Sequence, residues 1–242
     1  MKILSWNILA DEFIKKRYYP MIPPELLLNR KQRQTQIITT LTAMDMDVLL
    51  LQEVMLSEYK VLLHTFQLTH HIVRGKNIKW QNKQGASGNV ILLRKTLFQL
   101  PTSLPIISLT FGLGLHCLYK KQPFVIFNIH LDDLSVDLRH KQFAELLLHN
   151  NQNAPVIIGG DFNEHYNVKK PSMLYMAIKA GGLKILNQAL SYYIERKMCI
   201  DNILIKGVDL KHHLAHIMNP LQGDPVKQFQ TYGSDHLPVV VN

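Results

Sequence analysis

The chain has 242 residues, with 27 Lys or Arg against 18 Asp or Glu, which gives a formal net charge of +9. A hydrophobic content of 47% is enough to bury a sizeable core and argues against a disordered chain. No apolar run approaches the ~18 residues of a membrane span, so we expect no membrane insertion. The two cysteines, Cys117 and Cys199, have no metal-binding spacing, which argues against a disulfide scaffold and a structural zinc site.

The chain begins with MKILSWNILADEF, which lacks the features of a secretory signal peptide. We therefore expect a protein that is not secreted and acts in a reduced intracellular compartment, the cytoplasm or the nucleus. No protein partner can be inferred from the sequence, and we expect a monomer.

The positive charge is concentrated in one part of the chain. Residues 59–131 contain no Asp or Glu, and their nine basic residues equal the net charge of +9. These are Lys60, Arg74, Lys76, Lys79, Lys83, Arg94, Lys95, Lys120 and Lys121. Such a stretch favours a polyanionic partner, either nucleic acid or an anionic membrane surface. The alternative is a solvated basic face without a partner.

Short apolar runs of the β type alternate with helical stretches along the chain. We expect strands at residues 2–6, 48–51, 89–93, 124–129, 155–158, 202–205 and 239–241. Helical spacing of apolar residues predicts helices at residues 34–43, 136–149 and 170–180, the last ended by two glycines. Without a repeat or a linker, the pattern indicates a single α/β domain over residues 1–242.

Polar side chains able to bind a metal or move protons stand at six strand ends. They are Asn7, Glu53, His130, Asp161 with Asn163, Asp201, and Asp235 with His236. Taken singly, each has an ordinary explanation, such as a surface carboxylate for Glu53, a core histidine for His130 or a turn at residues 161–163. Together these explanations require every apolar strand to end in such a residue by accident, so we expect a common site.

The donor types indicate the chemistry. Asn7, Glu53 and Asp235 offer hard oxygen ligands without thiolates, which favours Mg²⁺ or Mn²⁺ over zinc or copper. Mg²⁺ takes one or two protein carboxylates and leaves positions for a substrate phosphate. The remaining His and Asp residues can activate water and neutralise charge on phosphorus, so we expect phosphoester hydrolysis.

Six motifs, in order, resemble those of the endonuclease/exonuclease/phosphatase family: SWNILAD, LLLQEV, FNIHLDD, IIGGDFNE, IDNILI and SDHLPVV. The resemblance implies a four-layer α/β/β/α sandwich with two mainly antiparallel sheets packed face to face. It also implies phosphoester cleavage with a divalent metal, usually Mg²⁺. The opening motif, a Tyr/Pro stretch and NRKQRQTQII are similar to the deadenylase branch that includes nocturnin and the Angel proteins. The segment FNIHLDD, followed by SVDLRHKQ, is more similar to the small, largely unassigned metal-dependent hydrolases of this family.

The resemblance also implies residue roles on the metal side of the site. Glu53 is the principal metal ligand, and Asn7 lies beside it as a ligand or a holder of water. Asp235 supports the metal. One position departs from the family pattern: Asn202 stands where an aromatic residue usually follows the Asp of the IDY motif.

By the same resemblance, four residues act on the attacking water or the phosphate, and a fifth holds one of them. Asp161 positions or deprotonates the attacking water, and Asn163 holds it. His130 and His236 contact the scissile phosphate, and Asp201 accepts a hydrogen bond from His236.

Three functions remain open at this point. The first is a Mg²⁺-dependent nuclease or phosphodiesterase acting on RNA or single-stranded DNA, which the acid-free basic stretch supports. The second is a phosphatase for a small phosphorylated metabolite or a lipid headgroup. The third is a catalytically inactive binding module on the same fold, which the full set of motif residues argues against.

Overall fold

The structure is a computed structural model that describes residues 1–75, 87–101, 106–149, 154–192, 198–208, 215–217 and 224–242. Lys76, Lys79 and Lys83 of the basic stretch lie outside the described residues. In the described part of the chain, no helix combines the length and the apolar character needed to cross a bilayer.

One sheet has six strands in the order β12-β13-β1-β2-β4-β3. The strands are β1 (Ile3–Asn7), β2 (Val48–Met55), β3 (His70–Arg74), β4 (Ser87–Arg94), β12 (His216–Ile217) and β13 (Val239–Val241). Only β1 and β2 run parallel among these neighbours, and the other pairs are antiparallel.

The second sheet has seven strands, in the order β10-β11-β9-β8-β7-β5, with β6 also paired to β7. Its strands are β5 (Phe98–Gln99), β6 (Ile106–Leu109), β7 (Gly112–Tyr119), β8 (Gln122–His130), β9 (Val156–Asp161), β10 (Lys184–Ile185) and β11 (Asp201–Lys206). Here too one neighbouring pair, β8 with β9, is parallel, and the others are antiparallel.

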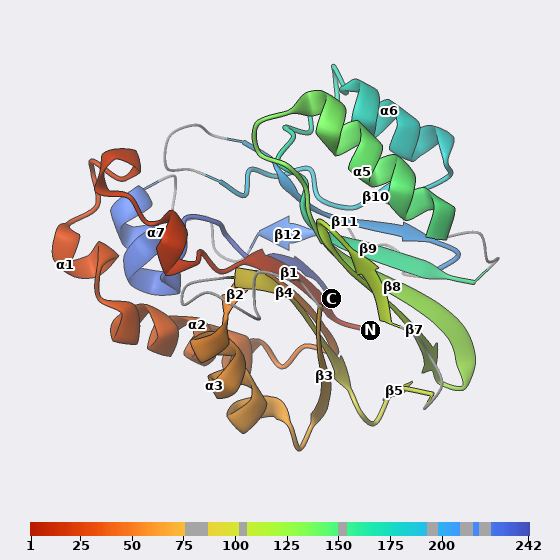
Figure 1. Cartoon of the computed structure of the whole chain (residues 1–242), viewed down its shortest axis with the longest axis horizontal. Helices are drawn as coiled ribbons and strands as arrows, with labels where there is room; N and C mark the ends of the chain where they lie inside the picture. Colours follow the sequence, from red (N-terminus) through yellow and green to blue (C-terminus); the bar gives the residue numbers. More distant parts are fainter. Residues whose placement is uncertain (76–86, 102–105, 150–153, 193–197, 209–214, 218–223) are drawn as a thin grey trace.

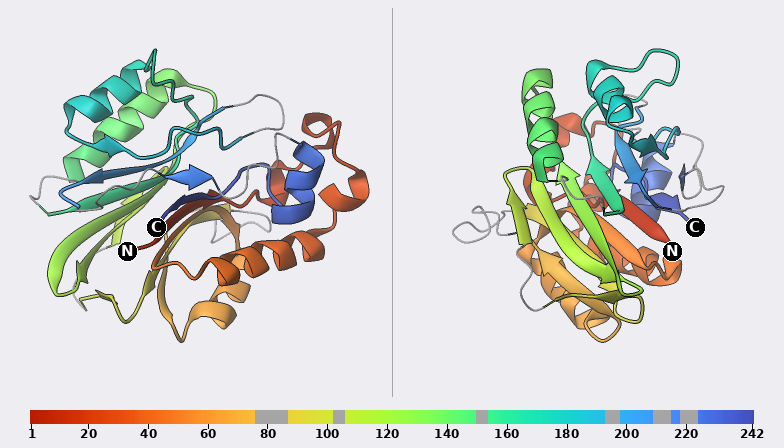
Figure 2. Two further views of the ribbon diagram at one scale, coloured as in Figure 1. Left: turned by 180° about the vertical axis from the view of Figure 1, so that it is seen from behind. Right: turned by 90° about the vertical axis from the view of Figure 1, so that its right-hand side faces the viewer.

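Helices cover the outer faces of both sheets (Figures 1 and 2). They are α1 (Pro24–Leu27), α2 (Arg30–Met44), α3 (Leu56–Phe66), α5 (Val136–His149), α6 (Met173–Ala180) and α7 (Pro225–Tyr232), with short 3₁₀ turns η1 (Asp11–Phe13) and η2 (Lys16–Tyr18). Helices α2 and α3 lie outside the first sheet, and α5 and α6 lie outside the second, while α1 and α7 pack against α2. The four-layer sandwich with two mainly antiparallel sheets is confirmed.

Strands β2 and β4 are apolar on both faces where they cross the centre of the first sheet. Residues 48–51 of β2 and 90–93 of β4 are buried, which explains why both strands read as continuous apolar runs without alternation. At Gly159 of β9, an added Cβ would lie 2.4 Å from the Leu50 side chain on the facing sheet, so glycine allows close contact there.

Most boundaries differ from the expectation by one to four residues, and two of the differences have a clear physical cause. The helix predicted at residues 170–180 begins at Met173, because Pro171 disfavours a helical conformation at Lys170 and Ser172 forms the N-cap. The strand predicted at residues 48–51 continues to Met55 through a register shift.

Gly160 is expected to be sensitive to a single added methyl group. It has φ +156°, and a Cβ there would lie 1.9 Å from the Ile129 carbonyl oxygen of β8. We expect Gly160→Ala to lower the free energy of unfolding by about 3 kcal/mol, because the parallel β8–β9 pair must separate. Urea denaturation measures this. The control is Gly181→Ala, where φ is −72° and the nearest atoms lie at 3.5 Å. Equal stability of the two variants would contradict the steric argument.

Candidate active site

Strand register brings the polar strand ends to one end of the sandwich. In the first sheet, the parallel pair β1–β2 sets Asn7 opposite Gln52. In the second sheet, the parallel pair β8–β9 sets His130 opposite Asp161. Strand β11 runs antiparallel to β9 and begins at Asp201, which also pairs with Asp161. Because carboxyl ends of parallel strands lie at the same edge, one edge of each sheet carries the polar residues.

A β-bulge in β2 sets the direction of the Glu53 side chain. The pairing of β2 with β4 shifts register between Leu51 and Val54, and Glu53 adopts φ +57° inside this shift. Leu9 (φ +55°) and Asn163 (φ +49°) also occupy the left-handed region, which is uncommon for residues other than glycine. All three lie at strand ends of the site, where backbone strain often accompanies function.

The acidic and histidine side chains form a row. His130 Nε2 lies 3.9 Å from Glu53 Oε1 and 3.8 Å from Asp161 Oδ2. On the other side of Asp161, His236 Nε2 lies 3.7 Å from the same Oδ2 atom. The row ends at Asp235, whose Oδ1 is 3.9 Å from His236 Nε2. A buried carboxylate therefore sits between two imidazoles, with a further carboxylate beyond each.

Asn7 joins two of these carboxylates. Its Nδ2 donates hydrogen bonds to Glu53 Oε1 at 2.7 Å and to Asp161 Oδ2 at 3.1 Å. Its Oδ1 accepts a hydrogen bond from the Leu9 backbone at 3.1 Å. In this orientation Asn7 acts as a donor, and it would ligate a metal through oxygen only after the amide turns over.

His236 is fixed from behind by Asp201. The distance from Nδ1 to Asp201 Oδ2 is 2.8 Å, so the hydrogen bond predicted from the sequence is present. Burial alone lowers the pKa of His236, but the charges of Asp201, Asp235 and Asp161 outweigh it and hold this pKa well above its ordinary value. The remaining Nε2 faces the centre of the row.

Asn163 supports the central carboxylate. Its backbone N–H donates to Asp161 Oδ1 at 2.8 Å, and its Nδ2 donates to the Leu131 carbonyl at 2.9 Å. The structure thus links all eight residues singled out in the sequence through direct contacts: Asn7, Glu53, His130, Asp161, Asn163, Asp201, Asp235 and His236. Their roles stay a prediction.

A buried polar group beneath the row was missed from the sequence. Asn128 of β8 is fully buried and donates across the sandwich to the carbonyls of Leu51 (2.8 Å) and Val90 (2.9 Å). Gln52 donates to Asn128 Oδ1 at 2.7 Å. Both residues stand beside predicted site residues in the motifs, which was the available signal. Their bonds fix the separation of the two sheets directly under the site.

The donor set fits a divalent cation. Burial raises the pKa of Glu53, the charge of His130 opposes this increase, and nearby Asp235 adds to it. Asp235 Oδ1 is buried and lacks a hydrogen-bond partner among the described residues. A cation near Glu53 and Asp235 would compensate these charges. Ligand atoms of Asp161, Asp201 and His236 also lie within 4.8 Å of one another. A cation there would compete with His236 for the Asp201 carboxylate, which is bonded to Nδ1 at 2.8 Å, so we favour the first position.

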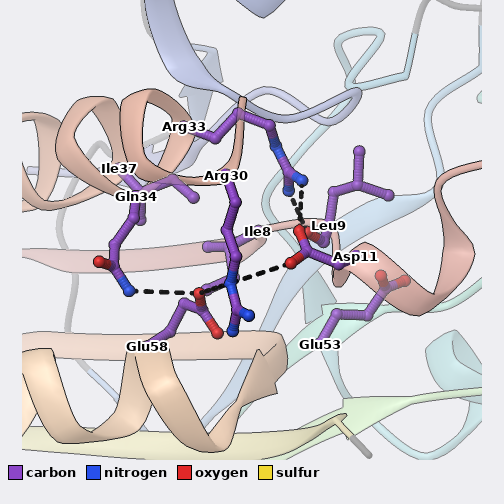
Figure 3. A pocket seen from close by; sticks show the side chains of 9 residues that line it. All are labelled: Ile8, Leu9, Asp11, Arg30, Arg33, Gln34, Ile37, Glu53 and Glu58. Atoms are coloured by element: carbon purple, nitrogen blue, oxygen red, sulfur yellow. Dashed lines mark hydrogen bonds and ion pairs between the residues drawn. The ribbon is translucent and has the colours of Figure 1, made fainter. Parts of the chain in front are cut away.

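Arg33 of α2 connects the two chain segments that carry the site. It is 4% exposed and donates to the Leu9 carbonyl, next to the segment holding Asn7. It also donates to the Gly233 carbonyl at 2.9 Å, two residues before Asp235. Figure 3 shows its guanidinium against Asp11, with an Nη1–Oδ1 distance of 2.8 Å.

We expect Arg33→Lys to weaken the binding of Mn²⁺ by up to about 10-fold. Groups that hydrogen-bond a metal ligand directly contribute about 10–100-fold, and Arg33 instead holds the backbone next to the ligands. A lysine ammonium cannot reach all three acceptors in their fixed directions. Calorimetric titration measures the affinity. The control is Arg30→Lys, one turn earlier on α2, whose side chain is 47% exposed and also contacts Asp11. Equal affinities of both variants for Mn²⁺ would contradict the proposed support.

The model of the Endonuclease/Exonuclease/phosphatase family matches residues 4–236. A search by sequence among curated proteins finds no significant match. ANGEL2, a 2',3'-cyclic phosphatase, in complex with adenosine-2',3'-vanadate, superposes with a TM-score of 0.74 at 17% identity, covering 99% of this chain and 94% of that one.

Two further structures illustrate the range of proteins with this fold. TDP2 from D. rerio, complexed with a single-strand DNA product, has a TM-score of 0.65 at 15% identity and covers 100% of this chain and 97% of its own. The mannosyl-6-phosphatase Bt3783 of Bacteroides thetaiotaomicron has a TM-score of 0.66 at 16% identity, with 100% and 98% covered. ANGEL2 agrees with the branch that the N-terminal motifs resemble. Since the family model spans nearly the whole chain, this protein belongs to the Endonuclease/Exonuclease/phosphatase family, a family of phosphoester hydrolases.

Proposed function

We propose that the protein is a Mg²⁺-dependent phosphodiesterase or nuclease that hydrolyses RNA or single-stranded nucleic acid. The observation that carries the proposal is the row in which Asp161 lies between His130 and His236, at 3.8 and 3.7 Å. Two imidazoles beside one buried carboxylate provide donors for a phosphate and an acceptor for a proton from water.

In this proposal Glu53 and Asp235 hold Mg²⁺ or Mn²⁺, with Asn7 contributing if its amide turns over. When bound, the cation polarises a phosphoryl oxygen and offsets the negative charge of the transition state. The Ala10 backbone N–H holds Glu53 Oε2 at 2.8 Å, so this carboxylate is fixed before any cation arrives.

The other residues act on water and phosphate. Asp161 accepts a proton from the attacking water, and Asn163 fixes the orientation of Asp161 through its backbone N–H. His236, held by Asp201 through Nδ1, directs Nε2 at a non-bridging phosphate oxygen, and His130 donates from the opposite side. Donors fixed before the reaction stabilise the developing charge on phosphorus without reorganisation.

The substrate class rests on charge and on similarity of fold. Residues 59–131 carry nine basic and no acidic residues, and phosphate contacts dominate nucleic-acid affinity. TDP2 binds a single-strand DNA product on the same fold. Bt3783, a mannosyl-6-phosphatase, supports the alternative of a small phosphorylated metabolite. A monomeric state and an intracellular location stay predictions from the sequence.

A panel of phosphoesters tests the proposal: poly(A), mixed-sequence RNA, single-stranded DNA, a sugar phosphate and a chromogenic diester, each with Mg²⁺. We expect turnover of the single-stranded polymers, with KM rising steeply over about 50–200 mM salt. Chelation by EDTA should abolish turnover, and Mg²⁺ or Mn²⁺ should restore it. Glu53→Gln should lose activity, whereas Glu58→Gln, another buried glutamate, should retain it.

The outcomes separate the candidates. Rapid hydrolysis of the sugar phosphate with a salt-insensitive KM, and none of the polymers, would replace the nuclease proposal with the phosphatase alternative. Turnover that resists EDTA would remove the cation from the mechanism. No turnover of any substrate, with cations bound, would favour a binding module.

Asp201→Asn should lower kcat by about 10²–10⁴-fold, because a neutral amide neither fixes the His236 tautomer nor stabilises its charged form. KM should change little, since Asp201 is fully buried behind His236 and does not meet the substrate. The control is Asp224→Asn, which keeps the N-cap of α7 because Asn caps as well as Asp. A kcat near that of the unmodified protein would remove Asp201 from the mechanism.

A further inference from the structure

A cavity of about 140 Å³ opens beside the candidate active site, in the Tyr/Pro stretch that lies outside the six ordered motifs. It is lined by residues 17–22, which connect η2 to α1, and by Pro225 at the start of α7. Figure 1 shows that α1 and α7 lie side by side at one end of the sandwich. The volume is several times that needed for one water molecule, so a small planar ring can enter.

Tyr19 connects this cavity to the metal side of the site. Tyr19 is one of the lining residues, and its ring packs edge-on against Phe229, with centroids 6.0 Å apart. Its hydroxyl donates to Asp235 Oδ2 at 3.0 Å. Burial, followed by the charge of Asp235, raises the pKa of this hydroxyl, so Tyr19 keeps its proton. The cavity therefore lies one tyrosine side chain away from a proposed metal ligand.

Two of the lining residues, Arg17 and Tyr18, have planar groups suited to stacking. The Arg17 guanidinium lies 4.8 Å from the centroid of the Tyr18 ring and donates to the Tyr18 hydroxyl at 2.9 Å. Tyr18 is 40% exposed and Met21 is 68% exposed, although both line the cavity. An arginine held on an aromatic ring presents a rigid, planar cation, which suits an aromatic ligand.

The charge near the cavity suits a ligand that carries phosphate. Residues 15–25 contain three basic residues, Lys15, Lys16 and Arg17, against the single acid Glu25. The nearest acids of the preceding turn have other partners: Asp11 contacts two arginines, and Glu12 accepts hydrogen bonds from Ser87.

We propose that this cavity binds the nucleobase of a nucleotide whose phosphate occupies the row of carboxylates and histidines. The inference rests on the proposed function and extends it, because it assigns recognition of the base to residues 17–22. An acyl chain would use the apolar wall but would leave the planar Arg17–Tyr18 pair without a partner. A bare sugar phosphate would leave the cavity empty.

The test compares two ligands that differ only in the base. AMP and ribose 5-phosphate are titrated against the full chain in the presence of Mg²⁺, by calorimetry. We expect AMP to bind about tenfold more tightly, which is within the range of one stacked base. Tyr18→Ala and Met21→Ala should each reduce this preference at least threefold. Leu28→Ala, at a side chain 67% exposed outside the cavity, should leave it unchanged.

These binding measurements test the proposed base site whether or not the protein hydrolyses a polymer. Equal affinity of the unmodified protein for AMP and ribose 5-phosphate would overturn it. The same holds for a preference that Tyr18→Ala and Met21→Ala leave intact, because the base would then bind elsewhere. A preference for AMP in a protein that hydrolyses no polymer would keep the base site and reject only the nuclease proposal. Thermal unfolding of each variant verifies that it is folded.

Discussion

The arrangement of the site depends on two parallel strand pairs, one in each sheet. The pair β1–β2 delivers Asn7 and the segment of Glu53, and the pair β8–β9 delivers His130 beside Asp161 in register. Every other neighbouring pair among the described strands is antiparallel, so within the described chain these two pairs alone place successive carboxyl ends at one edge. A shift by one residue in either pair would turn its polar side chain to the opposite face.

Bringing these carboxylates together costs free energy, and surrounding polar contacts offset part of that cost. Asn7 bridges Glu53 and Asp161, and Asn128 ties the second sheet to backbone carbonyls of the first. Arg33 joins the loops at either side of the site. Buried polar networks whose members are satisfied fix geometry well, and a divalent cation would complete the compensation of charge. The site is therefore built for a charged ligand before one binds.

Local pattern predicted the inner strands and three of the described helices, α2, α5 and α6, but not α1, α3 and α7 or the eight-residue strand β7. Apolar runs predicted β2, β4, β8 and β9, since strands covered on both faces are apolar throughout. Boundaries were less accurate where a cap or a bulge intervened, as at Ser172 and at Glu53. Strand β3, which carries histidines and an arginine, was missed because it lies at the sheet edge and is only partly buried.

By itself the sequence determined an α/β domain and the eight candidate site residues, because each motif joins an apolar strand to a polar end. The resemblance of the six motifs to a known family added the four-layer fold. Only the tertiary structure decided how these ends meet. The bulge and positive φ at Glu53, the donor orientation of Asn7 and the row centred on Asp161 all depend on register between strands distant in the chain. Arg33 and Tyr19 lie in segments that resemble the deadenylase branch, but the sequence assigned a role to neither residue. Their importance comes from contacts with residues about 200 positions away, at Gly233 and Asp235, which no local pattern encodes.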